Sequence, residues 1–322
     1  MRPERRKTEK FAKVEPSSVS DWGTQEDPST ARTARTVAPI IASTSGPDRA
    51  MLTQLTGLNA GQVFAADRPE VYIGRGKDAD LRLEDAGISR KHARIVHTTD
   101  GRYVLEDLRS TNGVFVNGRR TDRATLSSGD RVQLGPTCLL RFDFIDADEE
   151  KLARELFDSS TRDSLTRAYN RKYCGQRLAT EVAYALRHET QLGVIIFDLD
   201  HFKRVNDACG HLAGDVVLRV VAAMVAKMIR AEDVLARYGG EEFVVIARGI
   251  EHKNIAVFAE RLRRSVERLI IPWEGRSLKV TISAGVASLG ECREPRVDAL
   301  LTLADERLYR AKGEGRNAVC SE

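Results

Sequence analysis

The chain has 322 residues, of which 42% are hydrophobic and 30% are charged, a composition typical of soluble globular proteins. At about 150 residues per domain, this length predicts two domains. The 51 basic and 47 acidic residues leave a formal net charge of +4, so bulk charge does not indicate a nucleic-acid binder.

Membrane insertion and secretion are not expected from the sequence. No segment approaches the run of about 18 apolar residues that crosses a bilayer. The charged residues near the N-terminus are not followed by the apolar core of a secretory signal. The cysteines stand singly, which predicts neither a disulfide framework nor a zinc site and fits a reducing cytoplasm. They are Cys138, Cys174, Cys209, Cys292 and Cys320.

The first half of the chain divides into a tail and a β-rich domain. Residues 1–48 are rich in Ser, Thr, Pro and charge, which predicts a disordered tail. Residues 49–145 contain short apolar or alternating runs separated by turn signals such as Asn112-Gly113 and Asn117-Gly118, which predict an all-β sandwich. The runs begin at Val71, Leu81, Ala93, Tyr103, Val114, Arg131 and Leu139.

Residues 146–162 are predicted to form a linker helix. Ile145, Leu152 and Leu156 recur at helical spacing amid acidic residues. One interpretation is a connector that pairs with its copy in a second chain. The other is a solvated helix that packs on its own domain.

Residues 163–322 alternate between helical and strand patterns, which predicts an α/β domain. The continuous apolar run 192–197 indicates a buried strand, and two further strands flank Gly239-Gly240. Helices are expected over 170–187, 212–229, 252–269 and 297–312, and another strand over 277–288.

Carboxylates follow the strands of this domain. Asp198 closes the buried strand, and Glu241 and Glu242 lie at the tip of the hairpin, so neighbouring strands would bring Asp198 and Glu241 together. Such hard oxygen ligands suit Mg²⁺ with phosphate oxygens. The alternative is that Asp198 caps a helix and the glutamates form a solvated turn.

Residues 163–320 resemble a GGDEF domain of the diguanylate cyclase family. The third position of the signature is Glu rather than Asp, which keeps the carboxylate. The resemblance implies a palm-like nucleotidyl-cyclase fold. The motifs that carry it are Asp163-Ser-Leu-Thr166, Asn170-Arg171, Phe197-Asp-Leu-Asp-His-Phe-Lys203, Asn206-Asp207, Gly210-His211, Gly214-Asp215, Arg237-Tyr-Gly-Gly-Glu-Glu-Phe243, Ile282-Ser-Ala-Gly285, Ala304-Asp305, Leu308-Tyr-Arg-Ala-Lys312 and Gly315-Arg-Asn317.

The resemblance implies that two GTP molecules condense to cyclic di-GMP and two pyrophosphates. It assigns Mg²⁺ (or Mn²⁺) to Asp198, the carbonyl of Leu199 and Glu241, with Glu242 in support. The phosphate-contacting positions are Lys203, Lys312 and Arg316. Lys312 and Arg316 share a face if their helix continues, and the intervening glycines leave a loop as the alternative.

The same resemblance assigns guanine recognition to Asn206 and Asp215. A carboxylate accepts hydrogen bonds from guanine N1 and N2, a donor pair that adenine lacks, so ATP should be rejected. The alternative for Asp215 is a charge at a helix N-terminus. Each subunit holds one GTP, so catalysis needs a homodimer. Cys209 departs from the larger residue usual in the family, which bears on packing alone.

An inhibitory product site is implied by Arg230 and Asp233, which form an RxxD motif just before Gly239. Arg230 would hold a phosphate of cyclic di-GMP and Asp233 a guanine edge, with Arg261 as a second contact. The alternative is an ion pair at a helix end.

Residues 51–145 resemble a forkhead-associated (FHA) domain, a module that binds phosphothreonine peptides. The resemblance assigns phosphate contacts to Arg75, Ser89 and Thr111 with help from Arg90, and peptide-backbone contacts to Asn112. His92 matches a structural position. The alternative is a scaffold that has lost its ligand. The carrying motifs are Gly74-Arg75, Ser89-Arg-Lys-His92, Asp107-Leu-Arg-Ser-Thr-Asn-Gly113, Asn117-Gly118 and Gly129-Asp130.

Three functions follow as hypotheses: a regulated cyclase, a non-enzymatic receptor for cyclic di-GMP, and a phosphopeptide adaptor. The intact metal and guanine positions favour the cyclase. The phosphopeptide is expected from another protein or from the chain's own tail, where Thr24 has Asp27 three residues later. The roughly 28 residues between Thr24 and Leu52 form a tether with a root-mean-square span of roughly 30 Å, which is enough for the tail to dock on its own FHA domain.

Overall fold

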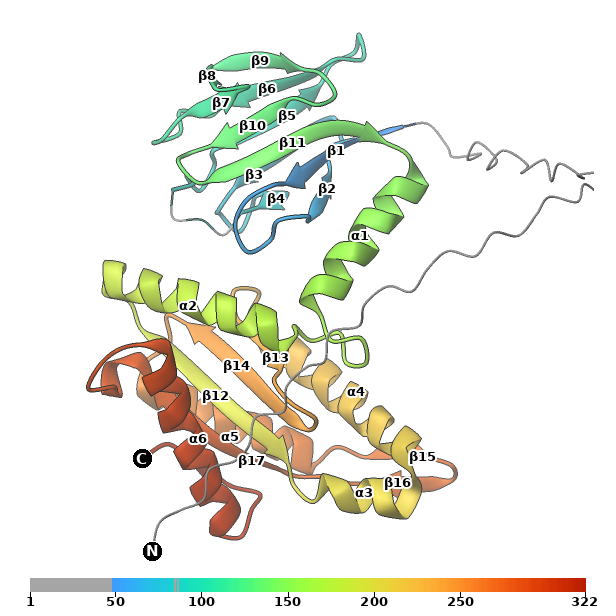
Figure 1. Ribbon diagram of the computed structural model, residues 1–322, viewed down its shortest axis with the longest axis vertical. Coiled ribbons are helices and arrows are strands. Elements are labelled where there is room, and N and C mark those ends of the chain that lie inside the picture. The colour runs from blue at the N-terminus through green and yellow to red at the C-terminus, as the bar shows by residue number, and fades with distance from the viewer. Residues whose placement is uncertain (1–47, 84, 86) are drawn as a thin grey trace, which may run out of the picture. The chain divides into compact units, whose positions relative to one another are not determined.

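A computed structural model of the chain describes residues 48–322 except residues 84 and 86. Residues 49–145 form a β-sandwich, which Figure 1 shows in blue and green. One sheet has the strand order β2-β1-β11-β10-β7-β8 and the other the order β4-β3-β5-β6-β9. The strands are β1 (Arg49–Gln54), β2 (Val63–Ala65), β3 (Glu70–Gly74), β4 (Leu81–Arg82), β5 (Ala93–His97), β6 (Tyr103–Asp107), β7 (Val114–Val116), β8 (Arg119–Arg120), β9 (Arg123–Leu126), β10 (Arg131–Leu134) and β11 (Cys138–Ile145).

Alternation along the strands explains the sandwich. In β5, Ala93 and Ile95 are fully buried while Arg94 is only partly buried, as expected when successive side chains face opposite sides of a sheet. Leu52 and Phe142 from the other sheet join the same core. The predicted all-β domain is confirmed.

Helix α1 (Ala147–Thr161) follows the sandwich, and the Asp146 side chain caps it by accepting from the N–H groups of Asp148 and Glu149. Its exposed face carries Leu152 and Leu156, which are 56% and 60% exposed. Ile145 does not belong to this helix as the spacing predicted. It ends β11, where it pairs with Arg49.

The second domain has a central sheet with the strand order β13-β14-β12-β17-β18. Helices α2 and α6 pack on one face, and α4 and α5 on the other. Because both faces are covered, all eight residues of β12 are buried. The elements are α2 (Arg171–His188), β12 (Leu192–Leu199), α3 (Phe202–Cys209), α4 (His211–Met228), β13 (Val234–Arg237), β14 (Glu242–Arg248), α5 (His252–Glu267), β15 (Ile271–Trp273), β16 (Arg276–Leu278), β17 (Ile282–Ser288), η1 (Leu289–Glu291), α6 (Val297–Gly313) and β18 (Val319–Cys320).

The α/β prediction is confirmed, with three local differences. The buried strand continues to Leu199, so Asp198 lies within β12 rather than after it. The helix α3 was not predicted. The strand expected over 277–288 is two strands, because β16 pairs with β15 in a separate hairpin while β17 pairs with β12 in the central sheet.

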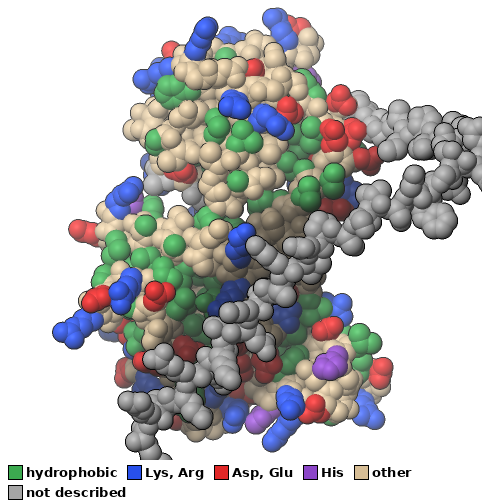
Figure 2. Space-filling model, viewed as in Figure 1, with side chains coloured by type: hydrophobic (Ala, Val, Ile, Leu, Met, Phe, Trp, Pro, Cys, Tyr) green, Lys and Arg blue, Asp and Glu red, His purple; other side chains and the backbone are tan. Residues whose placement is uncertain are grey.

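The surface carries both signs of charge. Figure 2 shows Lys and Arg side chains interspersed with Asp and Glu over the face in view, in keeping with the balanced composition. All five cysteines are free thiols. Among the described residues, no helix combines the length and apolar character needed to cross a membrane.

Candidate functional site

Three carboxylate residues, Asp198, Glu241 and Glu242, lie at one end of the central sheet. Strands β12 and β14 are antiparallel neighbours, and Asp198 lies opposite Glu242 in their register. The N–H of Leu199 donates to the carbonyl of Glu241 at 3.3 Å, which keeps the turn before β14 against the end of β12. The predicted convergence of Asp198 with the Gly-Gly-Glu-Glu turn is therefore present.

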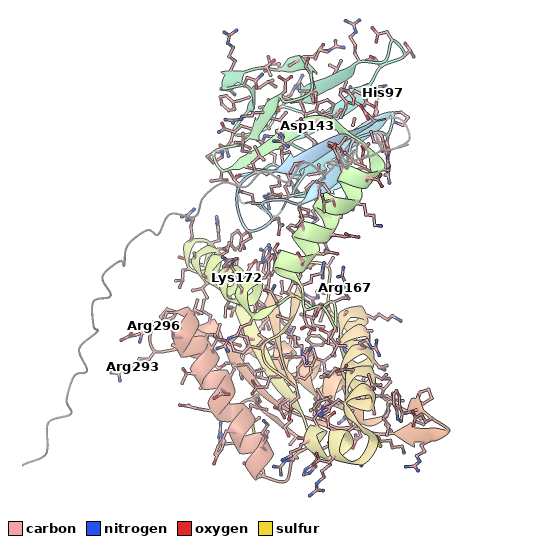
Figure 3. The ribbon with its side chains drawn as sticks, turned by 45° about the vertical axis from the view of Figure 1, so that its right-hand side comes forward. His97, Asp143, Arg167, Lys172, Arg293 and Arg296 are labelled. Atoms are coloured by element: carbon pink, nitrogen blue, oxygen red, sulfur yellow. The ribbon has the colours of Figure 1, made fainter. Side chains whose placement is uncertain are left out.

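Arg237 holds that turn in place, a role that sequence reasoning missed. Its Nη2 and Nε donate to the carbonyl of Gly240 at 2.7 and 3.0 Å, and its Nη1 contacts Asp163 Oδ1 at 3.1 Å. Asp163 in turn accepts from the backbone N–H and hydroxyl of Thr166. Figure 3 shows Arg167, the next residue, at the connection between α1 and α2. The signal was present, since both residues belong to the quoted motifs.

Helix α6 brings a cation to the carboxylates. The Lys312 ammonium lies 2.9 Å from Asp198 Oδ2. This contact depends on a close approach between α6 and β17, because a Cβ at Gly285 would lie 1.9 Å from the carbonyl oxygen of Ala304. Glycine at position 285 therefore allows the helix to rest directly on the strand backbone.

The carboxylates repel one another in a partly desolvated setting. Burial raises the pKa of Asp198, and hydrogen bonding to Lys312 opposes that rise. Burial also raises the pKa of Glu241, followed by the negative charge of Asp198. Anionic oxygens that repel each other fit a divalent cation. Within the described part of the chain, no group of three or more His, Cys, Asp or Glu side chains is placed to hold a metal. Ligands beyond two carboxylates would have to come from the backbone, the nucleotide or water.

The predicted guanine contacts lie on two adjoining helices. Asn206 is on α3 and Asp215 is in the second turn of α4. The two helices approach closely at Gly214, where a Cβ would lie 2.0 Å from Asn206 Oδ1. Lys203 lies in the first turn of α3 and is exposed.

Arg316 does not continue the helix that carries Lys312. Helix α6 ends at Gly313, and Arg316 has a φ of +66°. Of the two alternatives for this segment, the loop is therefore correct. Arg316 remains close enough to Asp198 for its charge to oppose the burial that raises the pKa of that carboxyl.

A separate cavity of about 240 Å³ contains Arg230, Asp233 and Arg261. Asp233 Oδ2 accepts from the N–H of Arg230 at 3.0 Å, while Oδ1 is buried without a hydrogen-bond partner. Burial raises the pKa of Asp233, opposed by the N–H of Arg230. Arg261 extends over the ring of Phe258, 4.9 Å from its centroid. The structure thus brings the three predicted product-site residues to one cavity.

The predicted phosphothreonine-binding residues meet in the loops of the β-sandwich. Ser89 Oγ donates to Thr111 Oγ1 at 3.3 Å and accepts from the N–H of Thr111 at 3.1 Å. The N–H of Arg75 donates to the carbonyl of Ser89 at 3.1 Å, and the N–H of Gly76 to that of Arg90. Three separated sequence segments are therefore held side by side.

His92 and Asn112 hold these loops from within. The N–H of Ser89 donates to His92 Nδ1 at 3.1 Å, and His92 Nε2 lies 3.1 Å from the carbonyl oxygen of Gly113. Burial lowers the pKa of His92, which favours the neutral ring. Asn112 Nδ2 donates to the carbonyl of Gly87 at 2.8 Å. Thr24, the candidate phosphosite, lies outside the described residues.

Comparisons with known proteins identify both domains. Residues 160–318 match the family described as "Diguanylate cyclase, GGDEF domain", and residues 71–135 match the FHA domain family. The fold and the site define a protein with a β-sandwich followed by an α/β domain that carries clustered carboxylates. The chain contains an FHA domain followed by a GGDEF domain.

Relatives of the GGDEF half are named as cyclases. Probable diguanylate cyclase DgcT of Escherichia coli is 42% identical over 160 residues, which are 49% of this chain and 35% of DgcT. Diguanylate cyclase DgcP of Pseudomonas aeruginosa is 41% identical over 157 residues, 49% of this chain and 23% of DgcP. The match thus spans about a third or less of either relative.

Among solved structures, the GGDEF domain of DgcB from Caulobacter crescentus in complex with c-di-GMP has 33% sequence identity and a TM-score of 0.48. The similarity covers 51% of this chain and 94% of that one.

Proposed function

We propose that this protein is a diguanylate cyclase that condenses two GTP molecules into cyclic di-GMP and two pyrophosphates. The carrying observation is the cluster of Asp198, Glu241 and Glu242 at one end of the sheet, with Lys312 2.9 Å from Asp198. Four charges of both signs at a strand end suit a triphosphate with its metal better than a solvated turn.

The residues around this cluster contact different parts of the nucleotide. Asn206 and Asp215 contact the guanine base, whose N1 and N2 donors are complementary to a carboxylate and an amide oxygen. Lys203, Lys312 and Arg316 contact the phosphates. The close approach at Gly214 supports this assignment, because it sets the two helices carrying the base contacts side by side.

The donor set fits a divalent cation. Asp198, Glu241 and the carbonyl of Leu199 would hold Mg²⁺ or Mn²⁺, with Glu242 in support, and the metal would neutralise triphosphate charge. In the reaction, the 3′-hydroxyl oxygen of each GTP bonds to the α-phosphorus of the other. The bond to the β,γ-pyrophosphate breaks, and each hydroxyl proton leaves to solvent. The chain's own residues orient the two groups and stabilise charge at the α-phosphate.

The reaction requires two copies of the chain, because each holds one GTP. Helix α1 supports a homodimer, since Leu152 and Leu156 expose an apolar stripe on it. We place the protein in the cytoplasm, where GTP is supplied.

Two regulatory sites complete the proposal. Cyclic di-GMP binds the cavity of Arg230, Asp233 and Arg261 and inhibits turnover. The cavity supports this, because two arginines and a carboxylate line it together and could hold a phosphate and a guanine edge of one ligand. A phosphothreonine peptide binds Arg75, Ser89, Arg90, Thr111 and Asn112. The peptide comes from another protein or from the tail around Thr24.

Incubation of the purified chain with GTP and Mg²⁺ tests the enzymatic proposal. Cyclic di-GMP should form in wild type and be lost in Glu241→Gln, which keeps the size of the side chain and removes its charge. Binding of cyclic di-GMP without any turnover would favour the receptor alternative. Equal turnover in wild type and Glu241→Gln would contradict the site assignment.

Calorimetric titration of the full chain with peptide 18–32 phosphorylated at Thr24 tests the FHA proposal. Its unphosphorylated twin should not bind, and Arg75→Ala should abolish binding of the phosphopeptide. Arg102→Ala is the control, because Arg102 pairs with Asp100 in its own turn and does not contact the site loops. Equal binding of both peptides would contradict phosphate recognition, and absence of both would remove Thr24 as the ligand.

A further inference from the structure

The loop that carries Arg316 has an unusual backbone. Arg316 and Asn317 have φ angles of +66° and +46°, so two successive residues other than glycine adopt the left-handed conformation. Cβ sterics disfavour this conformation, and such residues persist where surrounding contacts hold them. A set of contacts that fixes Asn317 therefore also fixes the backbone of Arg316.

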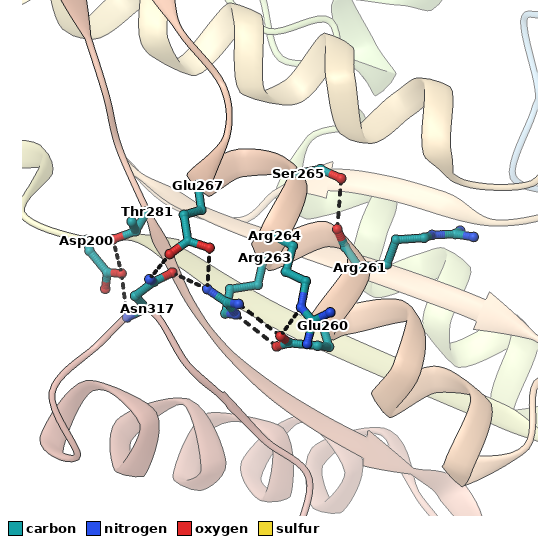
Figure 4. Close-up of polar contacts among 9 residues, drawn as sticks. All are labelled: Asp200, Glu260, Arg261, Arg263, Arg264, Ser265, Glu267, Thr281 and Asn317. Carbon is teal, nitrogen blue, oxygen red and sulfur yellow. Dashed lines mark hydrogen bonds and ion pairs between the residues drawn. The ribbon is translucent and has the colours of Figure 1, made fainter.

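Asn317 is held at three of its polar groups. Its backbone N–H donates to Asp200 Oδ2 at 3.0 Å. Its side-chain Oδ1 accepts from Arg263 Nη1 at 2.7 Å, and its Nδ2 donates to Glu267 Oε1 at 2.7 Å. Figure 4 shows Asn317 between these partners, with Asp200 on one side and helix α5 on the other.

Asp200 connects the loop to the central sheet. It is only 5% exposed, and it accepts from the hydroxyls of Ser283 at 2.6 Å and Thr281 at 2.7 Å. These hydrogen bonds occupy both oxygens of the Asp200 carboxylate, so we do not expect it to bind the metal or the nucleotide. The second Asp of the Asp-Leu-Asp motif thus anchors the loop, while Asp198 faces Lys312.

Arg263 connects the loop to helix α5. The side chain is 12% exposed, and its Nε and Nη2 donate to the two oxygens of Glu260, each at 2.9 Å. Its Nη1 also contacts Glu267 at 3.1 Å. Because Glu260 accepts from Nε and Nη2, the Arg263 guanidinium is held in the one orientation in which Nη1 donates to Asn317 Oδ1.

We infer that Arg263 is a positioning residue that acts through Asn317 to hold Arg316 at the triphosphate of GTP. The inference rests on the proposed function, which assigns Arg316 to the phosphates. On its N-terminal side the Arg316 backbone is held by its N–H bond to the carbonyl of Ala311 at 3.1 Å. On its C-terminal side the Arg316 backbone is held by the contacts that Asn317 makes with Arg263 and Asp200. Arg263 itself touches no part of the nucleotide.

The competing explanation is that Arg263 only stabilises helix α5 through its ion pairs. Arg264 provides a matched control, because it lies on the same helix and also donates to Glu260, at 2.7 Å. Arg264 is 61% exposed, and its ion pair is with Glu260 rather than with the loop. Replacing either arginine removes a pairing with Glu260, but only Arg263 reaches Asn317.

The test measures nucleotide binding by the full chain in Mg²⁺ buffer, with turnover excluded. The probe is 3′-deoxy-GTP, which lacks the attacking hydroxyl. GMP, which keeps the α-phosphate but lacks the β- and γ-phosphates, reports on binding without the pyrophosphate group. Arg263→Gln should weaken binding of 3′-deoxy-GTP about tenfold, the size of one charged hydrogen bond. The same variant should bind GMP as wild type does. Arg264→Gln should match wild type for both nucleotides.

A double variant separates positioning from stability. In an Arg316→Ala background, Arg263→Gln should cause no further loss of 3′-deoxy-GTP affinity, because the group that it positions is absent. Additive losses, or equal weakening of GMP, would overturn the inference. Arg263→Lys replaces Arg263→Gln if the latter fails to fold, since an ammonium lacks the planar set of donors that spans Glu260 and Asn317.

If wild type does not bind 3′-deoxy-GTP, the proposed function itself fails and the inference with it. Wild-type binding with no change in Arg263→Gln overturns the positioning role alone.

Discussion

Lys312 and Asp198 form an ion pair of 2.9 Å that joins the last turn of α6 to the end of β12. Asp198 is almost fully buried, so without Lys312 its charge would lose its hydrogen-bonded cation in the absence of metal, leaving only the more distant charge of Arg316. Lys312 therefore has a structural role in the nucleotide-free protein in addition to its proposed contact with phosphate.

We predict that Lys312→Met destabilises the metal-free protein by about 1–2 kcal/mol, because a buried carboxylate loses its charged partner. Urea unfolding with a chelator present measures this change. Adding Asp198→Asn should recover most of the loss, since the amide needs no counter-charge. Lys227→Met on the exposed side of α4 is the control. An equal loss in the control would contradict the assignment.

Gly214→Ala should raise the KM for GTP by about tenfold while the protein stays folded. The added Cβ would meet Asn206 Oδ1 at 2.0 Å and Phe202 at 2.9 Å, so it displaces a proposed guanine contact. Gly175→Ala on α2 is the control, because open space surrounds its Cβ position. An unchanged KM in Gly214→Ala would argue against base recognition by Asn206.

Arg230→Ala should relieve inhibition by cyclic di-GMP while sparing turnover at low product. Its guanidinium provides a cation beside Asp233 in the 240 Å³ cavity. The measurement is the initial rate against added cyclic di-GMP, with an expected rise of about tenfold or more in the half-inhibitory concentration. Superimposable inhibition curves would contradict a product site in this cavity.

The Arg263–Glu260 pair predicts a pH dependence of stability. Hydrogen bonding to Arg263 lowers the pKa of Glu260 from its ordinary value of 4.5. A lowered folded-state pKa contributes stability above the unfolded value, and this contribution is lost as pH falls through the folded value. Between about pH 5 and about pH 3, the free energy of unfolding should therefore fall more steeply in wild type than in Arg263→Gln. Parallel pH profiles from urea titrations would contradict the pairing.

The sequence was sufficient to predict the carboxylate cluster because short-range rules determine it. A continuous apolar run predicts a buried strand, and Gly239-Gly240 predicts the hairpin that returns Glu241 to its end. Helix α3 escaped prediction because it spans only eight residues and starts after His201, whose φ is +57° rather than that of a capping residue.

The anchoring role of Asp200 could not be predicted, because all its side-chain partners are distant in sequence. Thr281, Ser283 and Asn317 reach it only after β17 and the final loop have assembled. The family resemblance assigned Asp198 to a metal and gave no role to Asp200. Their opposite surroundings, Lys312 for one and hydroxyl groups for the other, distinguish them.

The close packing at Gly285 limits how near α6 can lie to β17. Helix and strand backbones already lie in close contact there, so α6 has no room to move closer to β17. A side chain larger than glycine at position 285 would therefore push α6 away from β17 and carry Lys312 away from Asp198.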